Sequence, residues 1–221
     1  MDARSTGLQQ EYQQRFQGTD AYRDSVWKML CEKFFSKYIS PNDVLLDCGA
    51  GWGEFSRNIK AKKKYAMDLN PDCGARVAGH SIFLMQDCST TWPLDEGSLD
   101  IVFTSNFLEH LPNKNLVDKT LEEAFRCLKP GGKFLCLGPN IKFVNGPYWD
   151  YWDHYIPITE ESLAETLSLR GFDVQCKIDK FLPYSMSGYI RPPLIALNIY
   201  LNLSLAWKFF GKQFFVVAKK P

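Results

Sequence analysis

Short, continuously apolar runs alternate along this chain with segments whose apolar side chains recur every three or four residues. The runs are typical of strands buried on both faces, and the periodic segments are typical of amphipathic helices. The sequence predicts strands at residues 44–47, 65–68, 82–85, 100–105, 133–137, 172–177 and 213–219. It predicts helices over residues 20–39, from about 54, and over 113–128, 159–169 and 194–209. This alternation predicts an α/β fold with a mostly parallel sheet and helices on both faces.

Turn and capping signals separate these elements. Pro41 and Asn42 are expected to end the first helix, and Pro130-Gly131-Gly132 is expected to form a turn before the fifth strand. Thr159 to Ser162 is a capping pattern at the start of a helix, and Gly171 is a stop signal after it. In a parallel sheet, ligands bind beyond the carboxyl ends of the strands, so residues at those ends are the candidates for chemistry.

The strongest motif follows the first strand, in the segment Asp47-Cys48-Gly49-Ala50-Gly51-Trp52-Gly53-Glu54. Its glycines allow a tight turn and a close approach of the backbone to a ligand. A dinucleotide fingerprint would place its third glycine one position later, where this chain has Glu54. Asp47 and Glu54 would also repel a pyrophosphate, whereas they suit a ligand with positive charge and no phosphate. The motif therefore favours S-adenosylmethionine over NAD.

The segment resembles motif I of the class I S-adenosylmethionine-dependent methyltransferases, and further motifs of that superfamily follow in order. The resemblance implies a Rossmann-like seven-stranded sheet with an antiparallel last strand. It also implies a set of cofactor-binding residues at the strand ends: Asp47, Gly49, Gly51, Gly53, Asp68, Leu69, Asp87, Cys88 and Asn106. Asp68 would hold the ribose hydroxyls, because a carboxylate accepts hydrogen bonds from two donors at once. Asp87 would accept a hydrogen bond from the adenine amino group.

The same resemblance suggests a domain organisation. We expect one domain over residues 1–221, because no linker, repeat or low-complexity tract is present. Residues 1–42 would form an N-terminal helical cap and residues 43–140 the cofactor-binding half. Residues 141–221 would form an acceptor-side half with a helical insert at about 183–210.

The chain has three histidines, and two of them are candidate bases for removing a proton from the methyl acceptor. His80 lies in a polar turn and is expected to face solvent. His110 follows the fourth strand, at the cofactor end of the sheet. His154 lies in an aromatic segment, residues 148–157, that resembles a segment over the acceptor pocket in a bacterial small-molecule and glycan-pathway subgroup. Asp153 is expected to orient His154, with Asp150 as a rival partner.

Two further segments are weaker candidates. Arg15, Phe16, Tyr22, Arg23 and Trp27 resemble a segment that closes over the cofactor, where an arginine or tyrosine would meet the methionine carboxylate; surface placement is the alternative. The predicted helix 194–209 has Asn198 and Asn202 on one face and apolar residues on the other (Leu194, Leu197, Leu201, Leu205 and Phe209). That face would pack on the domain, form a homodimer or contact a lipid-linked substrate.

Composition narrows the partners. The formal net charge of +1 provides no general attraction for nucleic acid, so none is expected as a partner. Seven scattered cysteines without zinc-type spacing predict a reducing, cytoplasmic environment and no metal site. The N-terminus is too polar for a signal peptide, and no transmembrane segment is expected.

The sequence thus predicts an S-adenosylmethionine-dependent methyltransferase. Its acceptor would be a small molecule, sugar-like or lipid-linked, methylated most readily at oxygen. A non-catalytic S-adenosylmethionine-binding module of the same fold is the main alternative, and an NAD-dependent oxidoreductase is a weaker one.

Overall fold

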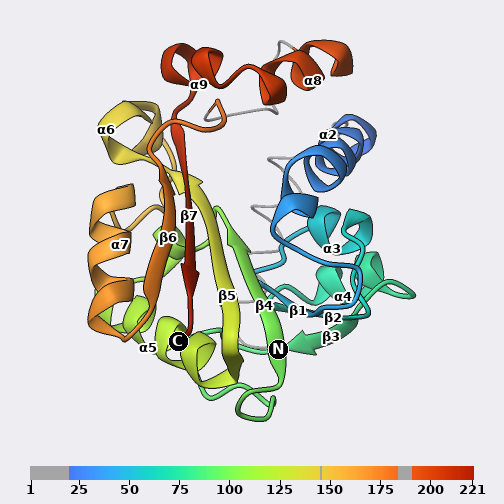
Figure 1. The fold of residues 1–221 in the computed structure, drawn as a ribbon, viewed down its shortest axis with the longest axis vertical. Coiled ribbons are helices and arrows are strands. Elements are labelled where there is room, and N and C mark those ends of the chain that lie inside the picture. Colours follow the sequence, from blue (N-terminus) through green and yellow to red (C-terminus); the bar gives the residue numbers. More distant parts are fainter. Residues whose placement is uncertain (1–19, 145, 184–190) are drawn as a thin grey trace.

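A seven-stranded sheet in the order β3-β2-β1-β4-β5-β7-β6 forms the centre of the fold (Figure 1). The computed structural model describes residues 20–144, 146–183 and 191–221. The strands are β1 (Val44–Cys48), β2 (Lys63–Asp68), β3 (Ile82–Met85), β4 (Leu99–Ser105), β5 (Leu128–Pro139), β6 (Asp173–Ile178) and β7 (Gln213–Lys219). Strands β1 to β5 pair in parallel, and β7 is antiparallel to both β5 and β6. The predicted Rossmann-like architecture with its antiparallel last strand is confirmed.

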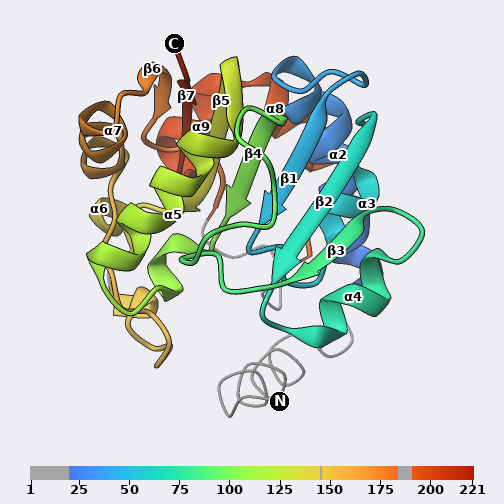
Figure 2. The same ribbon diagram turned by 90° about the horizontal axis from the view of Figure 1, so that it is seen from below.

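Helices cover both faces of this sheet (Figure 2). They are α2 (Asp20–Lys33), α3 (Glu54–Asn58), α4 (Pro71–Val77), α5 (Lys114–Cys127), α6 (Ile141–Val144), α7 (Glu160–Leu169), α8 (Leu194–Asn202) and α9 (Ser204–Phe210). Short 3₁₀ turns occur at η1 (Phe35–Lys37), η2 (Leu108–His110) and η3 (Gly146–Tyr148). Among the described residues, none of these helices combines the length and apolarity needed to cross a bilayer.

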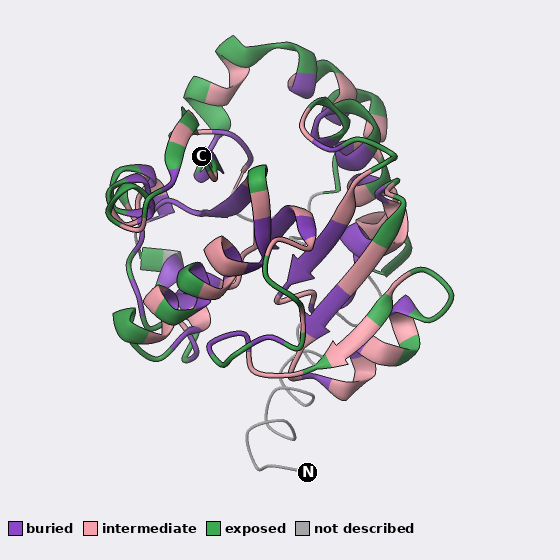
Figure 3. Cartoon of the chain, turned by 60° about the horizontal axis from the view of Figure 1, so that its bottom comes forward, coloured by how far each residue is buried: buried purple, intermediate pink, exposed green. Residues whose placement is uncertain are grey.

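Two hydrophobic cores form on opposite faces of the sheet, because successive strand residues point to opposite sides. Phe214 packs with residues of α5 and α7, whereas its neighbour Phe215 packs with residues of α2, η1 and α8. The same alternation separates Val102 from Phe103 in β4. Both faces are therefore buried, as the dark central strands of Figure 3 show, which explains why the strands read as continuous apolar runs.

The order of the strands reverses at β1, which lies between β2 and β4. Helices that follow neighbouring strands there leave on opposite faces, so the loops after β1 and β4 diverge and leave room for a ligand. The candidate residues at the ends of β1, β2 and β4 are consequently brought to one edge of the sheet.

Three predicted elements differ from the structure. The turn expected at Pro130-Gly131-Gly132 belongs to strand β5, which already begins at Leu128. The helix expected over residues 20–39 ends at Lys33 and continues as the 3₁₀ turn η1, which places Phe35 fully in the core. The single helix expected over 194–209 breaks at Leu203, so the predicted continuous apolar face is wrong: Leu197 and Leu201 are buried, but Leu205 and Phe209 are exposed. The break has a tertiary cause, because it lets the ring of Trp207 pack on Phe34 and Phe181.

Helix α4 was not predicted, although its start has a recognisable signal. The side chain of Asn70 accepts a hydrogen bond from the backbone N–H of Asp72, and Pro71 occupies the first helical position. An asparagine N-cap followed by proline is a typical helix start. By contrast, the predicted cap of α7 is confirmed, since Thr159 and Ser162 exchange hydrogen bonds in a capping box and Gly171 follows the helix with a φ of 86°.

We expect Thr159→Ala to lower the free energy of unfolding by about 1 kcal/mol, because the first turn of α7 loses a hydrogen-bond acceptor for its N–H groups. Urea unfolding followed by circular dichroism measures the change. Ser168→Ala, an exposed serine near the other end of the same helix, is the matched control and is expected to stay within about 0.5 kcal/mol of the parent. Equal losses in both variants would contradict the capping role.

Candidate functional site

The glycine loop after β1 has a conformation that only glycine adopts easily. Gly49, Gly51 and Gly53 have φ values of 73°, 55° and 70°, in the left-handed region that side chains disfavour. A Cβ atom on Gly49 would lie 2.3 Å from the ring of Phe107, and one on Gly53 would lie 2.3 Å from Val77. The loop therefore packs closely against Phe107, which follows β4, and against Val77, which lies in the helix after β2.

Asp68 connects the end of β2 to this loop. One oxygen of its carboxylate accepts a 2.7 Å hydrogen bond from the N–H of Gly51, and the other accepts one from the N–H of Asn70 at 2.8 Å. The backbone N–H of Leu69 is a third donor to this carboxylate, so one of its four lone-pair sites stays open for a ligand hydroxyl. The geometry fits the ribose-binding role that the sequence predicts for Asp68.

Negative charge is concentrated beneath the loop. Asp47 is buried, and desolvation, with further contributions from Asp68 and Glu54, raises its pKa to about 7, even though Ser56 donates a 2.7 Å hydrogen bond to it. Burial also raises the pKa of Asp68. Two carboxylates that are hard to ionise together attract a cation, because a positive charge nearby favours their charged forms.

Glu54 plays a different part from the one expected. The sequence analysis counted it among the carboxylates that face the ligand, but its side chain forms a 2.8 Å ion pair with Arg23 of α2. Both partners are largely buried, so the pair attaches α2 to the start of α3 and neutralises much of the charge of Glu54. The negative field at the loop therefore comes chiefly from Asp47 and Asp68.

The ends of β3 and β4 supply the other predicted cofactor residues. Asp87 accepts hydrogen bonds from both the backbone N–H and the hydroxyl of Ser89, which fixes its turn. The side chain of Cys88 is buried in the core beside that of Cys48. Asn106 has a φ of 48°, the only positive value outside glycine in the described ranges. Strained backbone of the kind seen at Asn106 often occurs at ligand-binding sites. The last predicted cofactor residue, Leu69, follows Asp68 at the end of β2 and is partly buried.

His110 and Asp153 form an ion pair across two loops. The imidazole Nδ1 lies 3.0 Å from the Asp153 carboxylate and 3.0 Å from the Asp153 carbonyl oxygen. Both of these atoms only accept hydrogen bonds, so Nδ1 donates and the basic lone pair lies on Nε2. Burial alone would lower the pKa of His110, but its hydrogen bond to Asp153 and the charges of Glu109 and Asp153 outweigh this effect and raise that pKa. His110 lies in η2, directly after β4, at the end of the sheet where Asp68 closes β2, and its charge lowers the pKa of Asp68.

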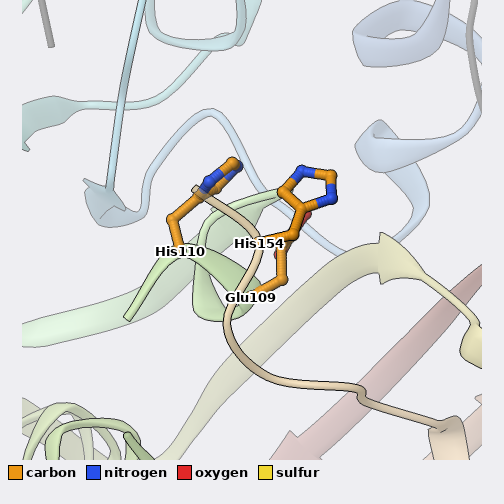
Figure 4. A group of neighbouring side chains, drawn as sticks. All are labelled: Glu109, His110 and His154. Atoms are coloured by element: carbon orange, nitrogen blue, oxygen red, sulfur yellow. The ribbon is translucent and has the colours of Figure 1, made fainter. Parts of the chain in front are cut away.

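Asp153 therefore orients a different histidine from the one expected. The Nδ1 of His154 donates instead to the carbonyl of Tyr148, at 2.6 Å, so its basic lone pair also lies on Nε2. The rival partner Asp150 is exposed. Asp153 lies in a turn that is closed by a hydrogen bond from the N–H of His154 to the carbonyl of Tyr151. The neighbouring side chains have different partners, Asp153 with His110 of η2 and His154 with Tyr148 of η3. The two imidazole rings lie edge to face, 4.8 Å apart between centroids (Figure 4).

Glu109 completes this cluster and was missed by the sequence analysis, although it precedes His110. Its side chain is buried, which raises its pKa, and its carbonyl accepts hydrogen bonds from the N–H groups of Tyr155 and Ile156. Glu109, His110 and His154 each place one potential metal-ligand atom within 4.8 Å of the others. Ligands of one zinc ion at about 2.1 Å can be at most about 4.2 Å apart, so the cluster would have to contract to hold an ion. The prediction of no metal site stays a prediction.

The remaining candidates have structural partners. Tyr22 donates to the carbonyl of Pro192, and Trp27 packs on Phe35, Phe55 and Phe103. Trp52, for which cofactor contact and packing were equally open, is buried against the guanidinium of Arg76, 3.2 Å from its ring. His80 is exposed as expected, and Arg15 and Phe16 lie outside the described residues.

Comparison with known proteins decides the family. Residues 20–177 match the family model described as "Methyltransferase domain". The chain belongs to this family. Its fold agrees with a S-adenosylmethionine-dependent methyltransferase from Archaeoglobus fulgidus, at a TM-score of 0.67 and 20% identity over 91% of this chain and 97% of that one. It also agrees with the N-methyltransferase NodS from Bradyrhizobium japonicum WM9 in complex with S-adenosylhomocysteine, at a TM-score of 0.65 and 13% identity over the full length of both.

Curated relatives are closer in sequence than these two structures, and their names differ in what is methylated. The chain is 26% identical to a demethylmenaquinone methyltransferase from Symbiobacterium thermophilum, over 75% of this chain and 70% of that protein. It is 28% identical to a sarcosine/dimethylglycine N-methyltransferase from Halorhodospira halochloris, over 54% of this chain and 45% of that protein. A mouse mitochondrial 2-methoxy-6-polyprenyl-1,4-benzoquinol methylase is 33% identical over 60% of this chain and 39% of that protein. The chain thus spans about half, or less than half, of the length of several of these relatives.

The family and the geometry agree on the cofactor. S-adenosylmethionine has an ammonium, a sulfonium and a ribose diol but no phosphate, and the site offers a buried and a partly buried carboxylate beside a glycine loop. The predicted cofactor and enzyme class are confirmed at the level of the family. The individual binding roles of Gly49, Gly51, Gly53, Leu69, Asp87, Cys88 and Asn106 stay predictions.

We expect the affinity for S-adenosylmethionine to rise as the pH increases through 7. The pKa of Asp47 is about 7 in the unliganded protein, so the carboxyl is largely neutral at pH 6 and charged at pH 8. A cationic ligand favours the charged form, and binding near pH 7 therefore releases a proton. Calorimetric titrations in buffers of different ionisation enthalpy measure both effects.

Asp47→Asn is the comparison for this measurement, since it keeps an acceptor for Ser56 but cannot ionise. The affinity of this variant for S-adenosylmethionine is expected to match that of the parent at low pH. It is expected to lack the part of the pH dependence that comes from the ionisation of Asp47. The amino group of the ligand titrates equally in both experiments and cancels. Identical pH dependences in the two proteins would exclude Asp47 as the responsible group.

Proposed function

We propose that this protein transfers a methyl group from S-adenosylmethionine to a hydroxyl-bearing small molecule, with His110 as the base that removes the hydroxyl proton. The observation that supports this most is the pair of His110 with Asp153, 3.0 Å apart, on the cofactor side of the sheet. A hydroxyl is a weak nucleophile until a base accepts its proton, whereas an unprotonated amine needs no such base. Methyl transfer itself then depends on in-line alignment of the oxygen with the sulfonium methyl.

Asp153 would act as a positioning residue in this scheme. It holds Nδ1–H of His110, which leaves Nε2 as the acceptor, and its charge stabilises the imidazolium that forms when the proton is taken up. Its own side chain is mostly buried, so the interaction is less screened than a surface pair. His154, with its Nε2 lone pair and its ring against that of His110, would hold the acceptor or relay the proton.

The aromatic loop around His154 supports a ring-shaped acceptor. Trp149, Tyr151, Trp152 and Tyr155 are exposed, and Trp152 retains 89% of its accessible surface. Exposed aromatic side chains beside a cluster of proton-accepting groups can stack on a planar or sugar ring and leave its hydroxyl near the base. We also propose that the helical insert of the acceptor-side half forms the far wall of the acceptor pocket.

A second candidate is methylation at carbon. Several curated relatives are named as quinone methyltransferases, including one for demethylmenaquinone. The same base can serve both reactions, since removing the proton of a ring hydroxyl makes the adjacent ring carbon nucleophilic as well as the oxygen. Mass spectrometry and NMR of the product from a panel of ring hydroxyl, amine and carboxyl acceptors distinguish them. A panel with no turnover, but tight S-adenosylhomocysteine binding, would favour the non-catalytic module.

We expect kcat/KM to increase with pH through the pKa of His110, because only the neutral imidazole accepts a proton. Since Asp153 raises that pKa, Asp153→Asn is expected to move the acidic limb of the profile to lower pH while lowering the plateau. His110→Ala is expected to lower kcat about 10²- to 10⁴-fold, the usual contribution of a general base.

Asp150→Asn, an exposed acid in the same loop, is the control and is expected to leave the profile in place. If the acidic limb of the kcat/KM profile of Asp153→Asn stays at the same pH as that of the parent, His110 is not the titrating base.

His154→Ala is expected to reduce turnover with little change in the affinity for the cofactor, because His154 lies with the acceptor-side loop. Calorimetry with S-adenosylhomocysteine and steady-state kinetics on the same preparation give the two values. Equal losses in both would mean that the residue is structural. NAD, titrated in parallel, is expected not to bind.

A further inference from the structure

The outermost part of the described C-terminal region exposes a cluster of large apolar side chains. On α8 and α9 and at the break between them, six residues retain 51–75% of their accessible surface: Ile195, Ile199, Leu203, Leu205, Phe209 and Phe210. We call this the α8–α9 surface. Contiguous exposed apolar residues of this kind mark an interaction site more often than isolated ones do.

The exposure is a property of folded helices. Ile195 and Ile199 lie four residues apart on one side of α8, as do Leu205 and Phe209 on α9, while Leu197 and Leu201 bury the other side of α8 in the core. Three hydrogen bonds hold the pair in place: Tyr22 to the carbonyl of Pro192, Tyr200 to that of Phe181 and Trp207 to that of Tyr200. The apolar side chains are therefore presented outward by an anchored element.

The segment that carries this surface has charged residues of one sign. Residues 180–212 contain four lysines and arginines and no aspartate or glutamate, although the whole chain has a net charge of only +1. Lys208 and Lys212 are exposed and flank Phe209 and Phe210 in the sequence. Lys180 donates to the carbonyl of Lys208, which places a third lysine at the same end of α9.

We propose that the α8–α9 surface docks on an anionic lipid bilayer. Two short helices that expose bulky aliphatic and phenyl groups between lysines match the pattern of interfacial helices, whose apolar side enters the boundary between headgroups and acyl chains. Lysines next to that boundary attract anionic headgroups. Both helices are far too short to span the membrane, so the protein would lie on the surface and detach reversibly.

The placement of this surface relative to the site adds a consequence. Helices α8 and α9 lie at the end of the sheet toward which β4 and β5 run, the end where the candidate site is found (Figure 1). Docking would therefore bring the acceptor side of the fold close to the lipid. The inference rests on exposure and charge alone and holds whichever acceptor the site uses.

Cosedimentation with vesicles tests the proposal with the full chain. Vesicles of phosphatidylcholine with 30 mol % phosphatidylglycerol are compared with pure phosphatidylcholine, at low and high salt. We expect the parent to bind the anionic vesicles. Phe209→Ser is expected to weaken this binding at least tenfold, because it removes apolar area that would enter the bilayer. Lys208→Glu is expected to weaken it at least tenfold as well, because it removes a charge that attracts the anionic headgroups. Leu169→Ser, an exposed leucine on α7, is the matched control and is expected to bind as the parent does.

Three results would overturn the proposal. The first is no vesicle binding by the parent, and the second is an equal loss in Leu169→Ser. The third is a stable dimer in light scattering that Phe209→Ser dissociates, which would assign the surface to a second copy of the chain. Methyltransferase activity on water-soluble acceptors is measured in the same variants. Its retention in Phe209→Ser separates a failure of docking from a failure of the proposed function.

Discussion

The close approach of two carboxylates, one buried and one partly buried, at neighbouring strand ends determines the character of this site. Asp47 and Asp68 lie at the tips of β1 and β2, where the parallel register brings them together beneath one glycine loop. An enzyme that bound a pyrophosphate at this position would need the opposite charge. The same topology places His110, at the end of β4, near enough to Asp68 to influence its ionisation. The choice of cofactor and the position of the proposed base both follow from this one edge of the sheet.

Much of this arrangement could be predicted from the sequence, because the decisive residues are local in pattern. The bounds of β3 and the capping box at Thr159 coincide with the prediction, since period, turn residues and caps act over a few positions. The glycine loop could be recognised because its three glycines are required by backbone conformation rather than by distant contacts.

The errors concern contacts between segments far apart in the sequence. Asp153 pairs with His110, 43 residues away, and not with its neighbour His154. Glu54 pairs with Arg23 of α2, which no spacing rule indicates. The helix expected over 194–209 breaks because Trp207 finds a place between Phe34 and Phe181. In each case the local pattern was compatible with the prediction, and a tertiary partner decided the outcome.

The loop that contains His154 is attached to the fold at its base. Tyr148 donates its hydroxyl to the carbonyl of Ile156, and the N–H groups of Tyr155 and Ile156 bond to the carbonyl of Glu109. The aromatic tip, with Trp152 at its outermost point, stands clear of these ties. Trp152 can therefore be exchanged while the imidazole geometry below is preserved. Such modularity offers evolution, and protein engineering, a route to new acceptors on an unchanged cofactor platform.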